Sequence, residues 1–352
     1  MNFIMATKKN KTADGLRLDY SGGGYPPAPS VSKAVRDALP KLNLYPYEWY
    51  DELRSAIASY SGVRKENVLP TNGGDEAIGI ITSIFGKRSL IPAPTYGQYE
   101  YIARAYGYSI RLKDCMPDGY NYKVAYTNSD LRWATLTWIC NPNNPTGNIV
   151  PREDIEDFLH ETGGLLVVDE AHYEFCGKTV VDMVERYDNL AVIRTFSKAF
   201  GIAGLRLGYI IANERLVERL NSSKQEFNVS RVSRDAGIAA LRSLPYYRRQ
   251  IRRTIAERDL TERFCRSLGI FAFESNGRFI LLRFSSRKEL YRVHRSLKAD
   301  GITTFVSGDS EFSGLRGPYM RIAAGSSMQM RRFRKAIRKV IIKKPVYSAN
   351  KK

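Results

Sequence analysis

The strongest constraint on the fold is a series of short, largely apolar runs that alternate with amphipathic segments. Residues 134–140, 164–168 and 190–193 are such runs, and helical patterns separate them. Strands without polar alternation are buried on both faces, which is typical of parallel sheets covered by helices. The sequence therefore predicts an α/β fold with a mostly parallel, doubly wound sheet.

A polar residue follows the end of each of these three predicted strands. Asn144 follows the first, Asp169 the second and Lys198 the third. In doubly wound sheets, ligands bind beyond the carboxyl ends of the strands. We therefore expect one pocket to hold all three side chains.

Lys198 lies in a glycine-rich stretch, residues 195–209, between two apolar runs. Thr195 and Ser197 precede it, and Arg206 follows. This set suits an imine to an aldehyde that also carries a phosphate. Taken alone, a solvated lysine in a glycine-rich loop is the better explanation of the pattern, so the other parts of the pocket must decide.

The remaining candidates complete a site for such a molecule. As a carboxylate, Asp169 can keep a pyridinium nitrogen protonated, although it can also cap a helix. Asn144 offers an amide donor to a ring oxygen, and Tyr96 can stack on the ring. A phosphate fits the glycine pair before a predicted helix and the nearby polar groups. These are Gly74, Asp75, Thr195, Ser197 and Arg206.

A chain of 352 residues exceeds the usual limit of one hydrophobic core. We predict an N-terminal arm and helix that join the small domain (residues 1–40), a large domain (41–235) and a small α+β domain (236–352). Four dispersed cysteines predict neither a disulfide framework nor a metal site. No signal peptide or apolar run of membrane-spanning length is evident, so we expect a cytoplasmic protein without membrane contact.

The net charge is +19, which favours anionic partners. Arginine pairs at 248–249 and 252–253 and the basic segment 331–344 carry part of it. These segments also carry core-facing stripes, and no known nucleic-acid-binding motif accompanies them. We therefore do not expect a nucleic-acid partner.

Five motifs in one order reveal a resemblance that covers nearly the whole chain. They occupy residues 72–76, 94–97, 141–147, 169–171 and 194–206. The chain resembles the fold-type-I, pyridoxal-phosphate-dependent aminotransferases, and among them it is most similar to the histidinol-phosphate aminotransferase branch.

The resemblance implies pyridoxal 5′-phosphate as cofactor, with an amino donor and a 2-oxo acid as substrates. Lys198 would bind the cofactor covalently and then move a proton between Cα and C4′. Tyr45 would reach the cofactor phosphate of a neighbouring subunit, which implies a homodimer. Arg321 would bind the anionic group of the substrate, and Asn144 and Tyr25 would also contact the substrate.

The chain departs from the family pattern at four places. His172 replaces a tyrosine that bonds the ring oxygen, and we expect its imidazole to titrate near neutral pH. Residues 22–24 are all glycine where an acidic arm is common. Thr304 and Phe305 replace Val-Arg, and Arg278, where Asn is common, becomes a candidate substitute for the lost arginine.

These departures affect the substrate more than the chemistry. The predicted activity is transfer of an amino group from histidinol phosphate to 2-oxoglutarate. A transaminase for aromatic or other amino acids is an alternative, because Phe305 would form a natural wall. A threonine-phosphate decarboxylase-like enzyme is another, although Ala203 stands where that relative usually has proline.

Overall fold

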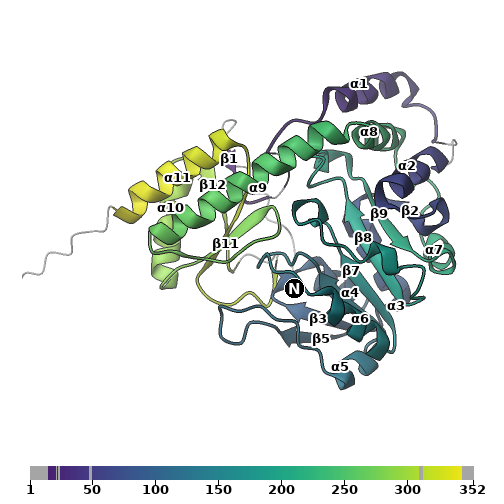
Figure 1. The fold of residues 1–352 in the computed structure, drawn as a ribbon, viewed down its shortest axis with the longest axis horizontal. Coiled ribbons are helices and arrows are strands. Elements are labelled where there is room, and N and C mark those ends of the chain that lie inside the picture. Colours follow the sequence, from purple (N-terminus) through teal and green to yellow (C-terminus); the bar gives the residue numbers. More distant parts are fainter. Residues whose placement is uncertain (1–14, 21, 23, 47–49, 309–311, 343–352) are drawn as a thin grey trace, which may run out of the picture.

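The structure, a computed structural model, describes residues 15–20, 22, 24–46, 50–308 and 312–342. A large domain and a smaller one lie side by side, and one long helix runs from the first to the second (Figure 1). Gly23, the start of the predicted N-terminal segment (residues 1–40) and the end of the predicted small domain (residues 236–352) lie outside the described residues.

The large domain is built on a seven-stranded sheet. Six strands run in one direction, and only β9 is antiparallel to its neighbours. In spatial order the strands are β2 (Val68–Thr71), β9 (Gly208–Ala212), β8 (Leu190–Thr195), β7 (Leu165–Asp169), β6 (Leu136–Cys140), β3 (Arg88–Ala93) and β5 (Ser109–Asp114). The predicted mostly parallel, doubly wound sheet is therefore confirmed.

Successive residues of the central strands enter different cores, as expected for a sheet buried on both faces. In β7, Leu166 and Val168 join one core, whereas Leu165 and Val167 join the other. The first core is covered by α1 (Pro29–Ala38), α2 (Asp51–Ser61), α5 (Asn128–Trp133), α6 (Arg152–Glu161) and α8 (Arg231–Leu241). The second is covered by α3 (Gly73–Phe85), α4 (Gln98–Ala105) and α7 (Glu214–Asn221).

The small domain is an antiparallel sheet with helices on one face, which confirms the predicted α+β character. Its strands are β10 (Phe271–Ala272), β11 (Phe279–Arg283), β15 (Tyr319–Ala323) and β13 (Phe305–Val306). Its helices are α9 (Leu244–Ser267), α10 (Arg287–Ala299) and α11 (Ser327–Ile342). Met320 and Ile322 pack against the helices, so Arg321 between them points to the opposite face, toward the large domain.

The N-terminal segment divides between the two domains, whereas the sequence predicts that all of residues 1–40 join the small domain. Strand β1 (Leu16–Arg17) pairs with β12 (Ile302–Thr303) of the small domain. Helix α1 does not join that domain: Val31 is buried in a large-domain core, and the helix packs on α8. A second pairing, between β4 (Thr95–Tyr96) and β14 (Phe312–Ser313), links the two domains beside the predicted site.

In the part of the chain that the structure describes, no helix combines the length and apolar character needed to cross a bilayer. All four cysteines are free thiols, and three of them are buried.

Candidate active site

The Lys198 loop joins β8 to β9, two neighbouring antiparallel strands. The Thr195 hydroxyl donates to Oγ of Ser197 (3.0 Å) and accepts from the Ser197 amide (3.1 Å). The Phe196 amide donates to the Leu207 carbonyl, so the two ends of the loop are tied together. This bonding holds Lys198, which is partly buried, at the carboxyl end of β8.

The start of α3 lies against the far end of that loop. A Cβ on Gly208 would be 2.7 Å from the carbonyl carbon of Gly73, so only glycine permits this approach. The contact brings the amino end of α3, with Gly74 and Asp75, beside Arg206. Backbone amides at a helix start together with a guanidinium form an anion site, as the sequence predicts for the phosphate.

Asp75 joins two other predicted residues. Its Oδ2 accepts from Nη2 of Arg206 (2.7 Å), and its Oδ1 accepts from the Tyr96 hydroxyl (3.0 Å). Both Asp75 and Arg206 are nearly half exposed, so their ion pair contributes little to stability. It orients the guanidinium and the Tyr96 ring toward one space.

Asp169 is a buried carboxylate at the end of β7, with a relative exposure of 5%. Tyr99 donates its hydroxyl to Oδ2 (2.6 Å), and the Ala171 amide donates to Oδ1 (2.9 Å). Burial raises the pKa of Asp169, whereas these two hydrogen bonds act in the opposite direction. A cation placed against this carboxylate would offset the cost of its burial.

Asn144 and Arg321 meet across the domain boundary. Arg321, 1% exposed, donates from Nη1 to Oδ1 of Asn144 (2.9 Å) and from Nη2 to the carbonyl of Asp19. Oδ1 of Asn144 accepts this bond, and its Nδ2, the donor of the amide, can bond a ligand. The Arg321 guanidinium also lies over the rings of Phe305 and Phe312, 5.3 and 4.9 Å from their centroids.

His172 does not fit the expectation that it titrates near neutral pH. It is buried, and burial together with the nearby cations Lys198, Arg321 and Arg278 lowers its pKa well below the usual value. The Arg278 amide donates to Nδ1 (3.3 Å), so the proton of the neutral ring is on Nε2. His172 is therefore a neutral imidazole with one N–H to donate.

Arg278 is placed differently from a substrate ligand. Its Nε donates to the Ala324 carbonyl (3.1 Å) and its Nη1 to the Lys198 carbonyl (3.0 Å). Burial lowers its pKa to about 10. A Cβ on Gly24 would be 2.5 Å from Nη2, so the arm presses directly on the guanidinium. In this structure the Arg278 guanidinium bonds backbone carbonyls of the protein, which is not the arrangement expected of a substrate ligand.

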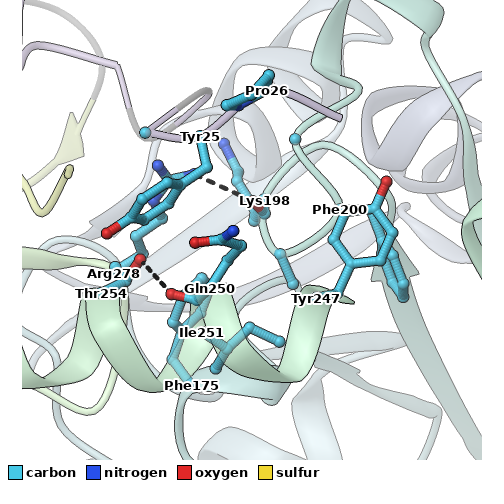
Figure 2. Close-up of a pocket in the computed structure, with 13 residues that line it drawn as sticks. Tyr25, Pro26, Phe175, Lys198, Phe200, Tyr247, Gln250, Ile251, Thr254 and Arg278 are labelled. Carbon is cyan, nitrogen blue, oxygen red and sulfur yellow. Dashed lines mark hydrogen bonds between the residues drawn. The ribbon is translucent and has the colours of Figure 1, made fainter. Parts of the chain in front are cut away.

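A small cavity of about 20 Å³ lies beside Arg278, large enough for one water molecule. Figure 2 shows Tyr25 and Arg278 on one side of it and Gln250 of α9 between them and Tyr247. Lys198 lines the cavity, whereas Asp169, Asn144 and Tyr96 do not. The cavity therefore lies on the other side of Lys198 from these three residues and is separate from the predicted cofactor site.

Tyr45 is not brought to the other predicted residues within this chain. It is 61% exposed, and its ring centroid lies 5.2 Å from that of Phe227. Leu39, Leu42 and Leu44 just before it are also more than half exposed. An apolar segment of this kind on the surface is typical of a contact with another subunit.

Sequence reasoning missed two supports of the site. Tyr99 bonds Asp169, but nothing in the sequence connects residues seventy positions apart. Asn143 donates to the Thr146 hydroxyl (2.7 Å) and accepts from the Thr95 hydroxyl (2.8 Å), which fixes the loop that carries Asn144. The asparagine pair in the 141–147 motif was the available signal for this second support.

The donor set fits pyridoxal phosphate. Asp169 offers a buried carboxylate for a ring nitrogen, Asn144 and His172 offer N–H donors for a ring oxygen, and Lys198 offers an amine. The start of α3 and the Arg206 guanidinium offer a phosphate site. Within the described residues, no group of three or more His, Cys, Asp or Glu side chains could hold a metal ion.

Comparison with known proteins agrees with this geometry. The family model for aminotransferase class I and II matches residues 18–337. A histidinol-phosphate aminotransferase of Ruminiclostridium cellulolyticum is 34% identical over 327 residues, which cover 89% of each chain.

Solved structures show the same fold. The histidinol-phosphate aminotransferase of Clostridium acetobutylicum superposes with a TM-score of 0.84 at 23% identity, covering 93% of this chain and 99% of that one. The Sinorhizobium meliloti enzyme, in complex with pyridoxal-5′-phosphate, has a TM-score of 0.79 at 24% identity. The matched regions cover 93% of this chain and 91% of that one.

Proposed function

Because this chain belongs to the class I and II aminotransferases, which depend on pyridoxal phosphate, we propose that it transfers the amino group of histidinol phosphate to 2-oxoglutarate. The observation that supports histidinol phosphate as the substrate is the similarity to relatives named histidinol-phosphate aminotransferase, at 34% identity over most of both chains. The site geometry supports the chemistry independently of those names.

When bound, the cofactor supplies an aldehyde for the amino group and a ring that withdraws electrons from Cα. Lys198 would hold it through Nζ, and Asp169 would keep the ring nitrogen protonated. Nδ2 of Asn144 and Nε2 of His172 would donate to the ring oxygen. The phosphate would be held by Gly74, Asp75, Thr195, Ser197 and Arg206, and Tyr96 would pack on the ring.

Lys198 would act as the base of the reaction, its Nζ taking the proton from Cα of the amino donor. The buried Arg278 donates from Nη1 to the Lys198 carbonyl. The bond from Arg278 to the Lys198 carbonyl limits the movement of that main chain. Lys198 can then move a proton from a fixed backbone position.

Arg321 is the proposed ligand for the carboxylate of 2-oxoglutarate. It is buried at the domain boundary and is held by Asn144 and the Asp19 carbonyl. A planar guanidinium held in this way suits bidentate binding of a carboxylate. Tyr25 of the N-terminal arm would close over the substrate.

The proposed assembly is a cytoplasmic homodimer. The homodimer is supported by the apolar side chains of Leu39, Leu42, Leu44 and Tyr45, which are more than half exposed in one chain. Tyr45 would then reach the phosphate of the partner's cofactor. The proposed division assigns α1 to the large domain and moves the second boundary from residue 235 into α9, because Ala236 and Ile238 of α8 and Tyr247 of α9 lie in a large-domain core, whereas Cys265 lies in the small-domain core.

A transaminase for aromatic amino acids is a second candidate, and one observation favours it. Phe305 lies opposite Arg321 in the strand pairing and packs on Phe312 with a centroid distance of 4.7 Å. An aromatic wall beside the carboxylate ligand would suit a planar side chain. Phe305 stands at the position of the lost arginine, and the hydroxyl of the preceding Thr304 is hydrogen-bonded to His294 of α10.

Steady-state kinetics with 2-oxoglutarate would test the proposal. We expect kcat/KM for histidinol phosphate to exceed that for phenylalanine and tyrosine by at least about tenfold, which is 1.4 kcal/mol of transition-state binding. The reverse order would favour the aromatic transaminase. No glutamate formation from any donor, with pyridoxal phosphate bound, would contradict both.

A further inference from the structure

Most of the excess positive charge lies on three helices: α10 and α11 of the small domain, and α9, which runs from the large domain into the small one. Helices α9, α10 and α11 contain eighteen Lys and Arg but only four Asp and Glu. Their surplus of fourteen accounts for most of the net charge of +19. The aminotransferase reaction uses none of these residues.

The three helices form one layer. Helix α11 contacts both α9 and α10, and α10, α11 and the C-terminal part of α9 lie side by side at the left of Figure 1, whereas the N-terminal part of α9 extends to α8 of the large domain. Their apolar residues, such as Leu290, Phe333 and Ile337, face the small-domain core. Most charged side chains of α10, α11 and the C-terminal part of α9 therefore face outward, whereas Arg258 and Arg334 are largely buried.

Few of these charges are neutralised within the protein. Of the eighteen cations, only Arg258, Arg292, Arg334 and Lys339 form an ion pair with another described residue. Unpaired like charges repel one another, and such a field attracts anions and raises their local concentration.

A groove of about 470 Å³ runs between α9 and α11 within this surface. Four cations line it, including the exposed Lys335 and Arg338, and Phe264 and Ile342 supply its apolar part. A basic groove with an aromatic side chain suits a strand of phosphates with bases that can stack. A flat bilayer surface would not enter such a groove.

We propose that the face formed by α9, α10 and α11 binds single-stranded nucleic acid, with the phosphates along the α9–α11 groove. Fourteen of the eighteen cations are arginines, whose planar fork matches phosphate. The concentration of unpaired charge in one layer, which the sequence does not reveal, revises the expectation of no nucleic-acid partner. The proposal is independent of the enzymatic function.

Fluorescence anisotropy of the full chain with pyridoxal phosphate would test it, using labelled 20-nucleotide oligo-U RNA and oligo-dT DNA between 50 and 200 mM KCl. We expect both to bind, with log K falling linearly against log salt. The double variant Lys335→Ala/Arg338→Ala should reduce that slope by about 1.4, or 0.7 for each lost phosphate contact.

The matched control is Lys87→Ala/Lys123→Ala, which removes two exposed large-domain charges. It should leave the slope near that of the unaltered protein. Equal losses in both variants, no binding at 50 mM KCl, or binding only to vesicles with 30% phosphatidylserine would each overturn the proposal. Circular dichroism of both variants would confirm that they are folded.

Discussion

Nη1 of Arg278 donates a hydrogen bond to the carbonyl oxygen of Lys198 at 3.0 Å. The same guanidinium bonds the Ala324 carbonyl of the small domain and lies against Gly24 of the N-terminal arm. Its backbone amide holds His172. One side chain therefore joins the lysine loop, the arm and the small domain, so the arm cannot move away without exposing this contact.

The first prediction concerns the fit between Gly24 and Arg278. Gly24→Ala should lower the free energy of unfolding by about 1–3 kcal/mol, because its Cβ would overlap Nη2. In an Arg278→Gln background the shorter side chain leaves room, and the same substitution should cost much less. Urea unfolding of the four proteins measures the coupling, expected at about 0.5–3 kcal/mol. Additive losses would show that the two residues do not share this contact.

Tyr99→Phe should change the pH dependence of catalysis. The Tyr99 hydrogen bond lowers the pKa of Asp169, so its removal raises that pKa, and Asp169 must be ionised to hold a ring nitrogen. The acid limb of the kcat/KM profile should therefore move to higher pH. The ring stacked on Trp138, at 4.5 Å, is kept by phenylalanine and should preserve the fold. If the acid limb were the same in Tyr99→Phe as in the unaltered protein, ionisation of Asp169 would not control kcat/KM.

The buried His172 should make the protein less stable in mild acid. Its pKa is lowered on folding, so the unfolded chain binds more protons below about pH 6.5, and the free energy of unfolding falls as pH decreases. This contribution approaches 1.4 kcal/mol per pH unit between the unfolded and folded pKa values. His172→Gln should lose that part of the slope, measured as the urea midpoint at pH 7.5, 6.5 and 5.5. Parallel slopes in both proteins would argue against the buried neutral ring.

Arg194 and Glu170 form an ion pair inside the large domain. Nε and Nη2 of Arg194 donate to Oε2 of Glu170 at 2.9 and 2.8 Å, and both side chains are almost fully buried. Arg194→Met should cost about 3–5 kcal/mol, because it leaves a buried carboxylate without its partner.

The double variant Arg194→Met/Glu170→Leu serves as the control for that prediction. Replacing both charges by apolar groups removes the uncompensated carboxylate, so part of the stability should return. Chemical unfolding of the two variants measures the difference in their free energies of unfolding and so tests this expectation. A double variant no more stable than Arg194→Met would indicate that other contacts of these residues, such as Arg194 over the Tyr173 ring, carry the effect.

The sequence alone was sufficient for the sheet and for the residues that follow its strands. Apolar strands such as β7 have one stable environment, with helices on both faces, and their carboxyl ends must then share one edge. Asp169, Asn144 and Lys198 therefore converge for a reason visible in the one-dimensional pattern. The same reasoning placed the glycine pair at the start of α3.

The tertiary structure alone decided the contacts between distant segments. The packing of α1 on the large domain, the bond from Tyr99 to Asp169 and the burial of His172 depend on which surfaces meet after folding. The distribution of charge is a second case: the composition sets the net charge at +19, but only the packing of α10, α11 and the C-terminal part of α9 brings much of the surplus together on one face. Local periodicity fixes the direction of a side chain within its element, whereas its partners come from elements that the pattern does not order in space.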